Sequence, residues 1–268
     1  MASDYCTRAQ LRSYLGLKTA ATEDDELLDA LITRSSRAID RYTRRWFYEL
    51  TDTREYDDPP GKYVLFLDAD LLSLTTLTID GSETTNYKLR PHNRTPYQWV
   101  EITYGSGDRF VWTNTPQDSV SVEGEWGWHD DYGNAWVTSG DTVQNTTEIT
   151  AAGTTLEVAD GANFAVRQTL KIADEQLLVT AISSQNLTVT RGINGTTAAV
   201  HANGTAISIY EPPADIVEQT VRMAAWYYRR KDTMFGETAT PSLGVVQKPL
   251  AIPPDVKATL DTYKRRRV

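Results

Sequence analysis

Cysteine and histidine are scarce in this sequence. One cysteine, Cys6, and three histidines, His92, His129 and His201, are spread over 268 residues. A single thiol cannot form an internal disulfide, and a structural zinc cage draws several Cys or His ligands from short spacings. We therefore expect no internal disulfide, no metal site and no cofactor.

Long apolar runs and an excess of positive charge are also missing. No apolar run approaches the roughly 18 residues that a membrane span needs, so we expect no membrane partner. The first residues do not combine a basic segment with an apolar one, so we expect no signal peptide and a cytosolic context. The chain carries 27 Lys and Arg against 36 Asp and Glu, a net charge of -9. This balance disfavours a nucleic-acid coat, which needs surplus cations to displace counterions from phosphates.

The charge is unevenly distributed along the chain. Residues 49–145 contain 17 acidic and 6 basic side chains, whereas residues 210–268 contain 7 acidic and 10 basic ones. The middle of the chain is therefore strongly acidic, and the C-terminal part is basic.

Helical periodicity occurs near both ends of the sequence. Thr7 and Gln10 have the spacing of a capping box, and Gly16 is a typical helix stop, so a short helix is predicted over 7–15. Apolar residues at helical spacing predict a long helix over 23–47. Pro212 and Pro213 introduce a third helix, predicted over 214–231.

Between these helices the pattern changes to short β-branched and aromatic runs. The first β region, from residue 49 to about residue 128, has turn signals at 59–61, 80–81 and 105–107, which favour antiparallel strands. Residues 138–155 are rich in Thr, Ser, Gly and Asn and are predicted to be a linker. A second set of short strands fills 154–209. We interpret residues 146–210 as a small β-barrel-like domain inserted between two parts that pack together.

The C-terminal part begins with residues 232–252, which show neither helical nor strand periodicity. This segment is predicted to be an extended arm that could span up to about 70 Å. The sequence Pro253-Pro254-Asp255 then starts a final helix, predicted to run to Arg267 with Val256, Leu260 and Tyr263 on one face. We expect this arm and helix to become ordered only against a partner.

Several residues are candidates for chemistry, each with a plainer interpretation. Asp57, Asp58, Asp68 and Asp70 could form an oxygen cage for a cation, but their spacing lacks the glycine and the bidentate Glu of an EF-hand loop, and a solvated acidic face is the default interpretation. His129 followed by two aspartates could act as an acid or base, and a hydrolase using these residues would need a perturbed carboxylate in a pocket. No Ser or Cys nucleophile motif and no phosphate-binding loop accompany them. We expect no catalytic residues and no enzyme.

The aromatic residues are weighted toward Trp and Tyr, with 7 Trp and 14 Tyr against 5 Phe. Trp and Tyr are enriched where one end of a side chain is buried and the other is wet. They are therefore interpreted as core and subunit-interface residues, with Trp126, Trp128 and Tyr227 as interface candidates. A sugar-stacking platform is the alternative; its candidates are Trp99, Trp112, Trp126, Trp128 and Trp136.

Four segments resemble the head–tail connector, or adaptor, proteins of long-tailed bacteriophages. The segments are DDELL at 24–28, AIDRYTRR at 38–45, LLSLTTLTIDG at 71–81 and VEGEWGW at 122–128. Their order, followed by a helix rich in Ala and Tyr and by a C-terminal arm, extends the resemblance over residues 7–136 and 211–268. The segment LTVTRGINGT at 187–196, with His201, resembles a small β module of various phage structural proteins. Most adaptors lack this module.

The resemblance implies an α+β fold with a helical connector core and an antiparallel β region. It divides the chain into a core of residues 1–137 and 211–231, an inserted all-β domain at 146–210, and an extended C-terminal arm ending in a portal-docking helix at 232–268. It also implies a non-enzymatic virion protein, assembled in the host cytoplasm, that forms a ring of twelve copies at the head–tail interface.

In such a ring the partners are the portal, a stopper or tail-completion protein, and DNA that passes through the channel without sequence-specific binding. The predicted portal-docking residues are Val256, Leu260, Tyr263, Lys264, Arg265, Arg266 and Arg267. The acidic residues Asp57, Asp58, Asp68 and Asp70 are predicted to face the channel, where negative charge lets DNA slide. A carbohydrate-binding or adhesin-type virion module is the alternative function.

Overall fold

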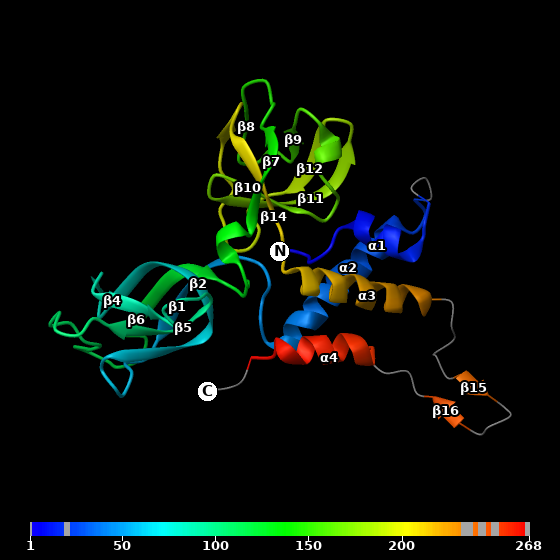
Figure 1. The fold of residues 1–268 in the computed structure, drawn as a ribbon. Helices are drawn as coiled ribbons and strands as arrows, with labels where there is room; N and C mark the ends of the chain where they lie inside the picture. The colour runs from blue at the N-terminus through cyan, green and yellow to red at the C-terminus, as the bar shows by residue number, and fades with distance from the viewer. Residues whose placement is uncertain (1, 19–21, 232–237, 241–244, 248–251, 266–268) are drawn as a thin grey trace.

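The computed structural model describes residues 2–18, 22–231, 238–240, 245–247 and 252–265. Within these ranges the fold is α+β: four helices, two antiparallel sheets of six strands, and small two-stranded sheets. Figure 1 shows the first sheet at the left, the second at the top, and the helices packed together at the right. The α+β prediction is confirmed.

The helices are amphipathic and bury their apolar faces against one another. They are α1 (Arg8–Leu15), α2 (Asp25–Thr43), α3 (Ala214–Arg229) and α4 (Pro254–Thr262). Leu28 and Ile32 of α2 pack with Val221 and Ala224 of α3 in one buried cluster, which confirms the predicted contact between these helices. The capping box at Thr7 and the left-handed C-cap at Gly16 also form as predicted. However, α2 ends at Thr43, earlier than expected.

The first sheet has the strand order β1-β6-β2-β5-β4, with β3 on β2. The strands are β1 (Leu50–Tyr56), β2 (Val64–Ile79), β3 (Ser82–Glu83), β4 (Tyr87–Arg90), β5 (Tyr97–Ile102) and β6 (Val120–Trp126). Strand β2 is long, with 16 residues that run without interruption from Val64 to Ile79. Register shifts along β2 let its first part pair with β5 and its second part with β6.

The second sheet has the order β7-β14-β10-β11-β12-β9, and β8 pairs with β13 beside it. The strands are β7 (Trp136–Thr142), β8 (Glu148–Ile149), β9 (Thr155–Glu157), β10 (Thr169–Ile172), β11 (Glu175–Ser183), β12 (Asn186–Thr190), β13 (His201–Ala202) and β14 (Ala206–Tyr210). The strands expected between 154 and 209 are therefore present. The linker prediction for 138–155 is wrong, because β7 lies in it and pairs with β14. The sheet begins at Trp136, before the expected domain boundary at 146.

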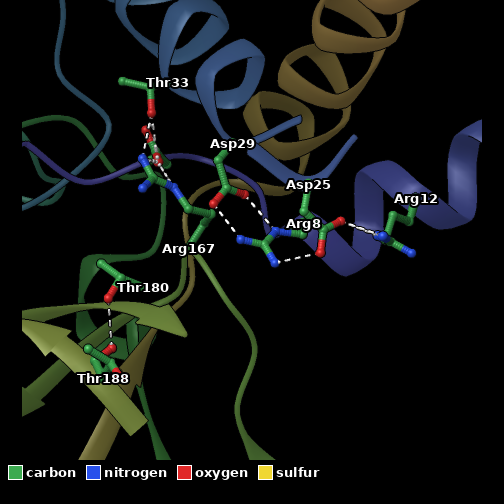
Figure 2. A network of polar contacts seen from close by, with 9 residues as sticks. Arg8, Arg12, Asp25, Asp29, Thr33, Arg167, Thr180 and Thr188 are labelled. Atoms are coloured by element: carbon green, nitrogen blue, oxygen red, sulfur yellow. Dashed lines mark hydrogen bonds and ion pairs between the residues drawn. The ribbon is translucent and has the colours of Figure 1, made fainter. Parts of the chain in front are cut away.

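Charged side chains tie the two N-terminal helices to each other and to the second sheet. Arg8 of α1 donates to Asp25 at 3.0 Å and to Asp29 at 2.7 Å, both on α2. Arg167, in the turn before β10, donates to Asp4 at 2.6 Å and also contacts Thr33 of α2. Figure 2 shows these pairs lying side by side at the edge of the helical layer. The second sheet is therefore held by specific polar contacts as well as by the chain itself.

Helix α4 packs against the chain's own core. Val256 and Leu260 are fully buried in a cluster that contains Phe47, Ile216 and Met223. Helix α4 ends at Thr262, short of the predicted Arg267. In the segment expected to be an extended arm, the described residues form an antiparallel strand pair, β15 (Thr238–Thr240) with β16 (Val245–Gln247). The remaining positions of that arm lie outside the described residues.

Candidate partner-binding surface

Three of the four segments that carry the sequence resemblance, 38–45, 71–81 and 122–128, meet at one joint between the helices and the first sheet. Trp128 donates its backbone N–H to the carbonyl of Trp46 at 2.7 Å, just beyond the end of α2. Gly127 donates to the carbonyl of Asp70 on β2 at 2.8 Å. The end of β6 is therefore held between the chain that leaves α2 and the middle of β2.

The glycines of the VEGEWGW segment are explained by close backbone approach. A Cβ on Gly124 would lie 2.2 Å from the carbonyl oxygen of Ser73, and one on Gly127 would lie 2.2 Å from that of Tyr48. Gly127 also has a φ of +148°, which side chains rarely adopt. Any larger residue at either position would push β6 away from its neighbours.

Aromatic rings fill the joint. The ring centroid of Trp128 lies 4.9 Å from that of Tyr263 and 5.7 Å from that of Phe47, in edge-to-face arrangements. Such pairs contribute roughly 0.5–1.5 kcal/mol beyond the area they bury. Tyr263 also donates its hydroxyl to Asp215 of α3 at 2.8 Å. Residues from β6, α3 and the end of α4 are thereby joined.

A buried carboxylate with two arginines lies beside these rings. Asp70 has only 3% of its side chain exposed; its oxygens lie 3.4 Å from Arg45 Nε and 3.5 Å from Arg265 Nη1. Burial raises the pKa of Asp70, and the two guanidinium groups partly offset this effect. Burial also lowers the pKa of Arg45. Asp70 therefore holds two cations in place and is not on the surface, contrary to its predicted place in a channel.

A hollow of about 480 Å³ opens on the outer side of this group. Its lining is basic and aromatic: Arg45, Phe66, Leu67, Gln98, Trp99, Lys264 and Arg265. Phe66 is 59% exposed, and its ring centroid lies 6.0 Å from that of Trp99. Arg265 donates to the carbonyl of Leu67 at 2.8 Å, which fixes the chain after α4 against β2. Exposed aromatic rings beside fixed cations are suited to binding an acidic partner surface.

Sequence reasoning found Lys264 and Arg265, named Trp99 only as a candidate of the sugar-stacking platform, and missed Arg45 and Phe66. A signal for Phe66 was present, because it alternates with the buried Leu65 and Leu67 along β2 and so points outward. No sequence signal links Trp99 or Arg45 to the C-terminal residues, since the fold alone brings them together.

The other acidic residues predicted to face a channel lie in different settings. Asp57 and Asp68 are exposed, and Asp68 accepts hydrogen bonds from Arg54 at 2.9 Å and Tyr56 at 2.6 Å. Asp58 is half-buried and pairs with Lys62 at 2.7 Å. Among the residues that the structure describes, no group of three or more His, Cys, Asp or Glu is arranged to hold a metal ion. The cation-cage interpretation is therefore not supported there.

The predicted interface aromatics are occupied within the chain. Trp126 is fully buried and donates its indole N–H to the carbonyl of Asp52 at 3.0 Å. Trp128 is half-buried in the joint, and Tyr227 is half-buried with the guanidinium of Arg34 at 4.1 Å from its ring centre. Trp126 thus belongs to the core of the first sheet and presents no surface to a second subunit. The sugar platform also loses Trp126 as a member.

The predicted portal-docking residues divide into three groups. Val256 and Leu260 are core residues, and Tyr263 is half-buried in the joint, so their apolar surface faces this chain. Lys264 and Arg265 line the hollow. Arg266 and Arg267 lie outside the described residues. The expectation that this helix orders only against a partner differs from the structure, in which α4 is packed onto α2 and α3.

A second hollow, of about 400 Å³, lies between the N-terminal segment, the turn before β10 and the start of α3. Cys6 and Asp4 line it. Burial raises the pKa of the Cys6 thiol far above its usual range, so the thiol stays protonated and is a poor nucleophile. Asp4 is fully buried and is engaged by Arg167. These groups have structural partners and do not form an activated nucleophile.

No helix in the described part of the chain is long and apolar enough to cross a membrane.

Comparisons with known proteins find similarity to a solved structure. No protein-family model matches the chain, and no curated protein matches it. A solved chain described as "Neck of empty GTA particle computed with C6 symmetry" is similar over 98% of this chain and 91% of its own length. The sequence identity is 15% and the TM-score is 0.40. These values do not establish a family.

Proposed function

We propose that this chain is a structural protein of the neck of a phage-like particle. In this role it is one subunit of a ring, of twelve copies in our proposal, that joins the portal to the stopper or tail and continues the DNA channel. The ring is part of the virion at the head–tail interface and carries out no reaction. The observation that carries this proposal is the joint described above.

The joint supports the proposal because it is built from the segments that resemble connector proteins. Residues 38–45, 71–81 and 122–128 are far apart in the sequence and meet at this joint. The guanidinium of Arg45 lies 5.7 Å from the centre of the Trp128 ring, and Leu71 pairs with Trp126 across β2 and β6. The close approach at Gly124 and Gly127 gives a physical reason for the glycines of the last segment. The resemblance therefore concerns residues that determine the fold, and adaptor function follows from it as a proposal.

The acidic character of the middle region fits a channel through which DNA moves. Asp57 and Asp68 are the two members of the predicted acidic set with exposed side chains. Exposed carboxylates repel phosphates, so a lumen lined with them would not retain DNA. We propose Asp57 and Asp68 as channel-facing residues, and we leave out Asp70 because it is buried.

The portal remains a proposed partner. We no longer propose that it contacts the apolar face of α4, as the sequence analysis expected. Exposing Val256 and Leu260 to a portal would remove them from the core, at a cost of about 1.5–3 kcal/mol for each side chain. In its packed form α4 offers only its outer face, with Lys257, Ala258 and Asp261. We propose this outer face as the portal-facing surface.

The test is attachment to portal particles. DNA-filled heads lacking this protein should bind the purified full chain in a ring that cryo-electron microscopy resolves beneath the portal. The variant Gly127→Trp, which disrupts the joint, should fail to attach, and Gly61→Ala, where a Cβ meets nothing within 4 Å, is the control. Wild-type protein that is folded but does not attach would contradict the proposal. Binding to glycans by such protein would favour the carbohydrate-binding alternative.

A further inference from the structure

The hollow at Arg45 lies at one end of helix α2, and an acidic surface with the opposite character lies at the other end. Helix α2 has 19 residues and is therefore about 28 Å long. Arg44 and Arg45 directly follow its last residue, whereas Glu23 and Glu26 lie at its start. The two ends of one helix thus present different surfaces.

The acidic end has carboxylates that no residue of the described chain neutralises. Asp24 accepts from Lys231 at 2.7 Å, and Asp25 and Asp29 are paired with Arg8. Glu23 and Glu26, by contrast, are exposed and have no ion pair or hydrogen bond with any described residue. They are therefore available to a cation from outside the molecule.

An exposed leucine lies beside these carboxylates. Leu27 of α2 is 36% exposed, while the neighbouring Leu28 is fully buried. An apolar side chain flanked by two free carboxylates matches a hollow with aromatic rings and cations. The acidic end of α2 and the hollow are therefore complementary both in the sign of their charge and in their apolar character.

The described residues that line the hollow include three cations, Arg45, Lys264 and Arg265, and no carboxylate. The nearby carboxylates lie outside this lining: Asp70 is buried beside Arg45 and Arg265, Asp68 interacts electrostatically with Arg265, and Asp261 lies 3.4 Å from Lys264. Arg44, exposed at the C-cap of α2, directly precedes Arg45 in the sequence. In a chain of net charge -9, a basic surface of this kind attracts acidic surfaces of other copies of the same chain.

We propose that copies of this chain contact one another head to tail through the two ends of α2. Leu27 of one copy, with Glu23 and Glu26, enters the basic aromatic hollow of the next copy, between Phe66, Trp99 and Lys264. The two surfaces are different, so the contact is heterologous and closes into a ring when the rotation between copies allows it. This inference rests on the proposed ring function, because it names the surface between ring subunits.

The experiment uses two full-length charge-reversal variants. Glu23→Lys with Glu26→Lys reverses the acidic end, and Gln98→Glu with Lys264→Glu reverses the hollow without touching Arg45, Arg265 or Asp70. Self-association is measured by sedimentation velocity and native mass spectrometry over a range of protein concentrations up to millimolar. Each variant alone should associate at least tenfold more weakly than the wild type. Circular dichroism confirms that each is folded.

A mixture of the two variants is the decisive sample. In an equimolar mixture each reversed end meets a complementary reversed end, so association should return, in alternating order. The matched control is Glu123→Lys with Glu148→Lys, which makes the same charge change at exposed positions of β6 and β8 and should leave association unchanged. Added salt should weaken the wild-type contact, because screening beyond about 8 Å acts on exposed charges.

The remaining outcomes separate this inference from the proposed function. Rings formed by both variants alone would overturn the inference and leave the ring proposal standing. A wild-type chain that stays monomeric at millimolar concentration would also overturn it, while attachment to portal particles tests the ring function independently. If the hollow variant loses affinity for duplex DNA and self-associates normally, the hollow is a DNA contact and the inference fails.

Discussion

Glu49 and Lys171, separated by 122 residues in the sequence, form an ion pair of 2.8 Å that joins the start of the first sheet to the second. Glu49 is 2% exposed and also accepts hydrogen bonds from Tyr132 at 2.7 Å, Trp136 at 2.7 Å and Gln176 at 3.1 Å. One carboxylate thus satisfies donors from four separate segments. Its role is to fix the second sheet relative to the rest of the molecule.

Glu49→Ala is expected to destabilise the protein strongly. Removing one member of a buried charged network typically costs about 3–5 kcal/mol, because the partners remain buried without an acceptor. Chemical denaturation should show this loss. Glu49→Gln keeps an acceptor for Tyr132 and Trp136, so its loss should be smaller. Equal stability of the Ala variant and the wild type would mean that the second sheet is held by its apolar contacts alone.

Excision of the second sheet is a related test, and the boundary decides its outcome. Cutting out 146–209 leaves β7 without its partner β14, so this variant should be unstable. Cutting out 137–209 with a short linker keeps Trp136 beside Tyr210, whose ring centroids lie 4.9 Å apart, and should retain more of the fold. Cooperativity of thermal unfolding distinguishes the two. Similar unfolding of both variants would show that the boundary at Trp136 is unimportant.

Sequence patterns predicted the helices and most strands because their periodicity is local. The capping box at Thr7 and the helix stop at Gly16 depend on neighbouring residues and formed as expected. Asp70 could not be placed this way. Alternation along β2 puts Phe66 and Asp68 outside and predicts the same for Asp70, but β2 shifts register between Phe66 and Leu71 and turns Asp70 inward. The face of the strand on which Asp70 lies therefore depends on pairing with residues far away in the sequence.

The candidate surface was predictable only in part, for the same reason. The basic C-terminal residues were visible in the sequence, but their neighbours come from β2, β5 and the end of α2. Helical spacing correctly gave Val256 and Leu260 a common apolar face. It did not show whether this face contacts a partner or the chain's own core. An amphipathic pattern predicts that a helix face is buried, but it does not predict which surface covers that face.

Leu260→Ala should destabilise the isolated protein by about 2–5 kcal/mol, since it leaves a cavity among fully buried side chains. Truncation after Ile252 should have a larger effect, because it also removes Val256 and Tyr263. Urea denaturation of the purified chain checks both changes. Thr262→Ala, at an exposed position of the same helix, is the control. A truncated chain as stable as the wild type would restore the view of α4 as an independent docking element.

The last prediction concerns pH and the buried carboxyl of Asp40, which accepts a hydrogen bond from the hydroxyl of Tyr5 and pairs with Arg37 at 3.2 Å. Burial raises the pKa of Asp40 to about 6, although Arg37 acts in the opposite direction. In the unfolded chain an aspartate has a pKa of about 3.9. The folded state therefore binds the proton more tightly than the unfolded state does.

The sign of the stability change follows from this difference. Proton binding by Asp40 therefore adds to the free energy of unfolding. This contribution is fully present below about pH 4 and is lost as the pH rises through about 6, and it amounts to about 1.4 kcal/mol for each unit of difference between the folded and unfolded pKa. Asp40→Asn keeps an acceptor for Tyr5 but does not titrate. The stability of this variant relative to the wild type should therefore increase between pH 4 and pH 7, and urea denaturation at several pH values measures it. Asp174→Asn, at an exposed turn, is the matched control. A relative stability that is the same at every pH would mean that Asp40 is ionised throughout, and that Arg37 outweighs the effect of burial.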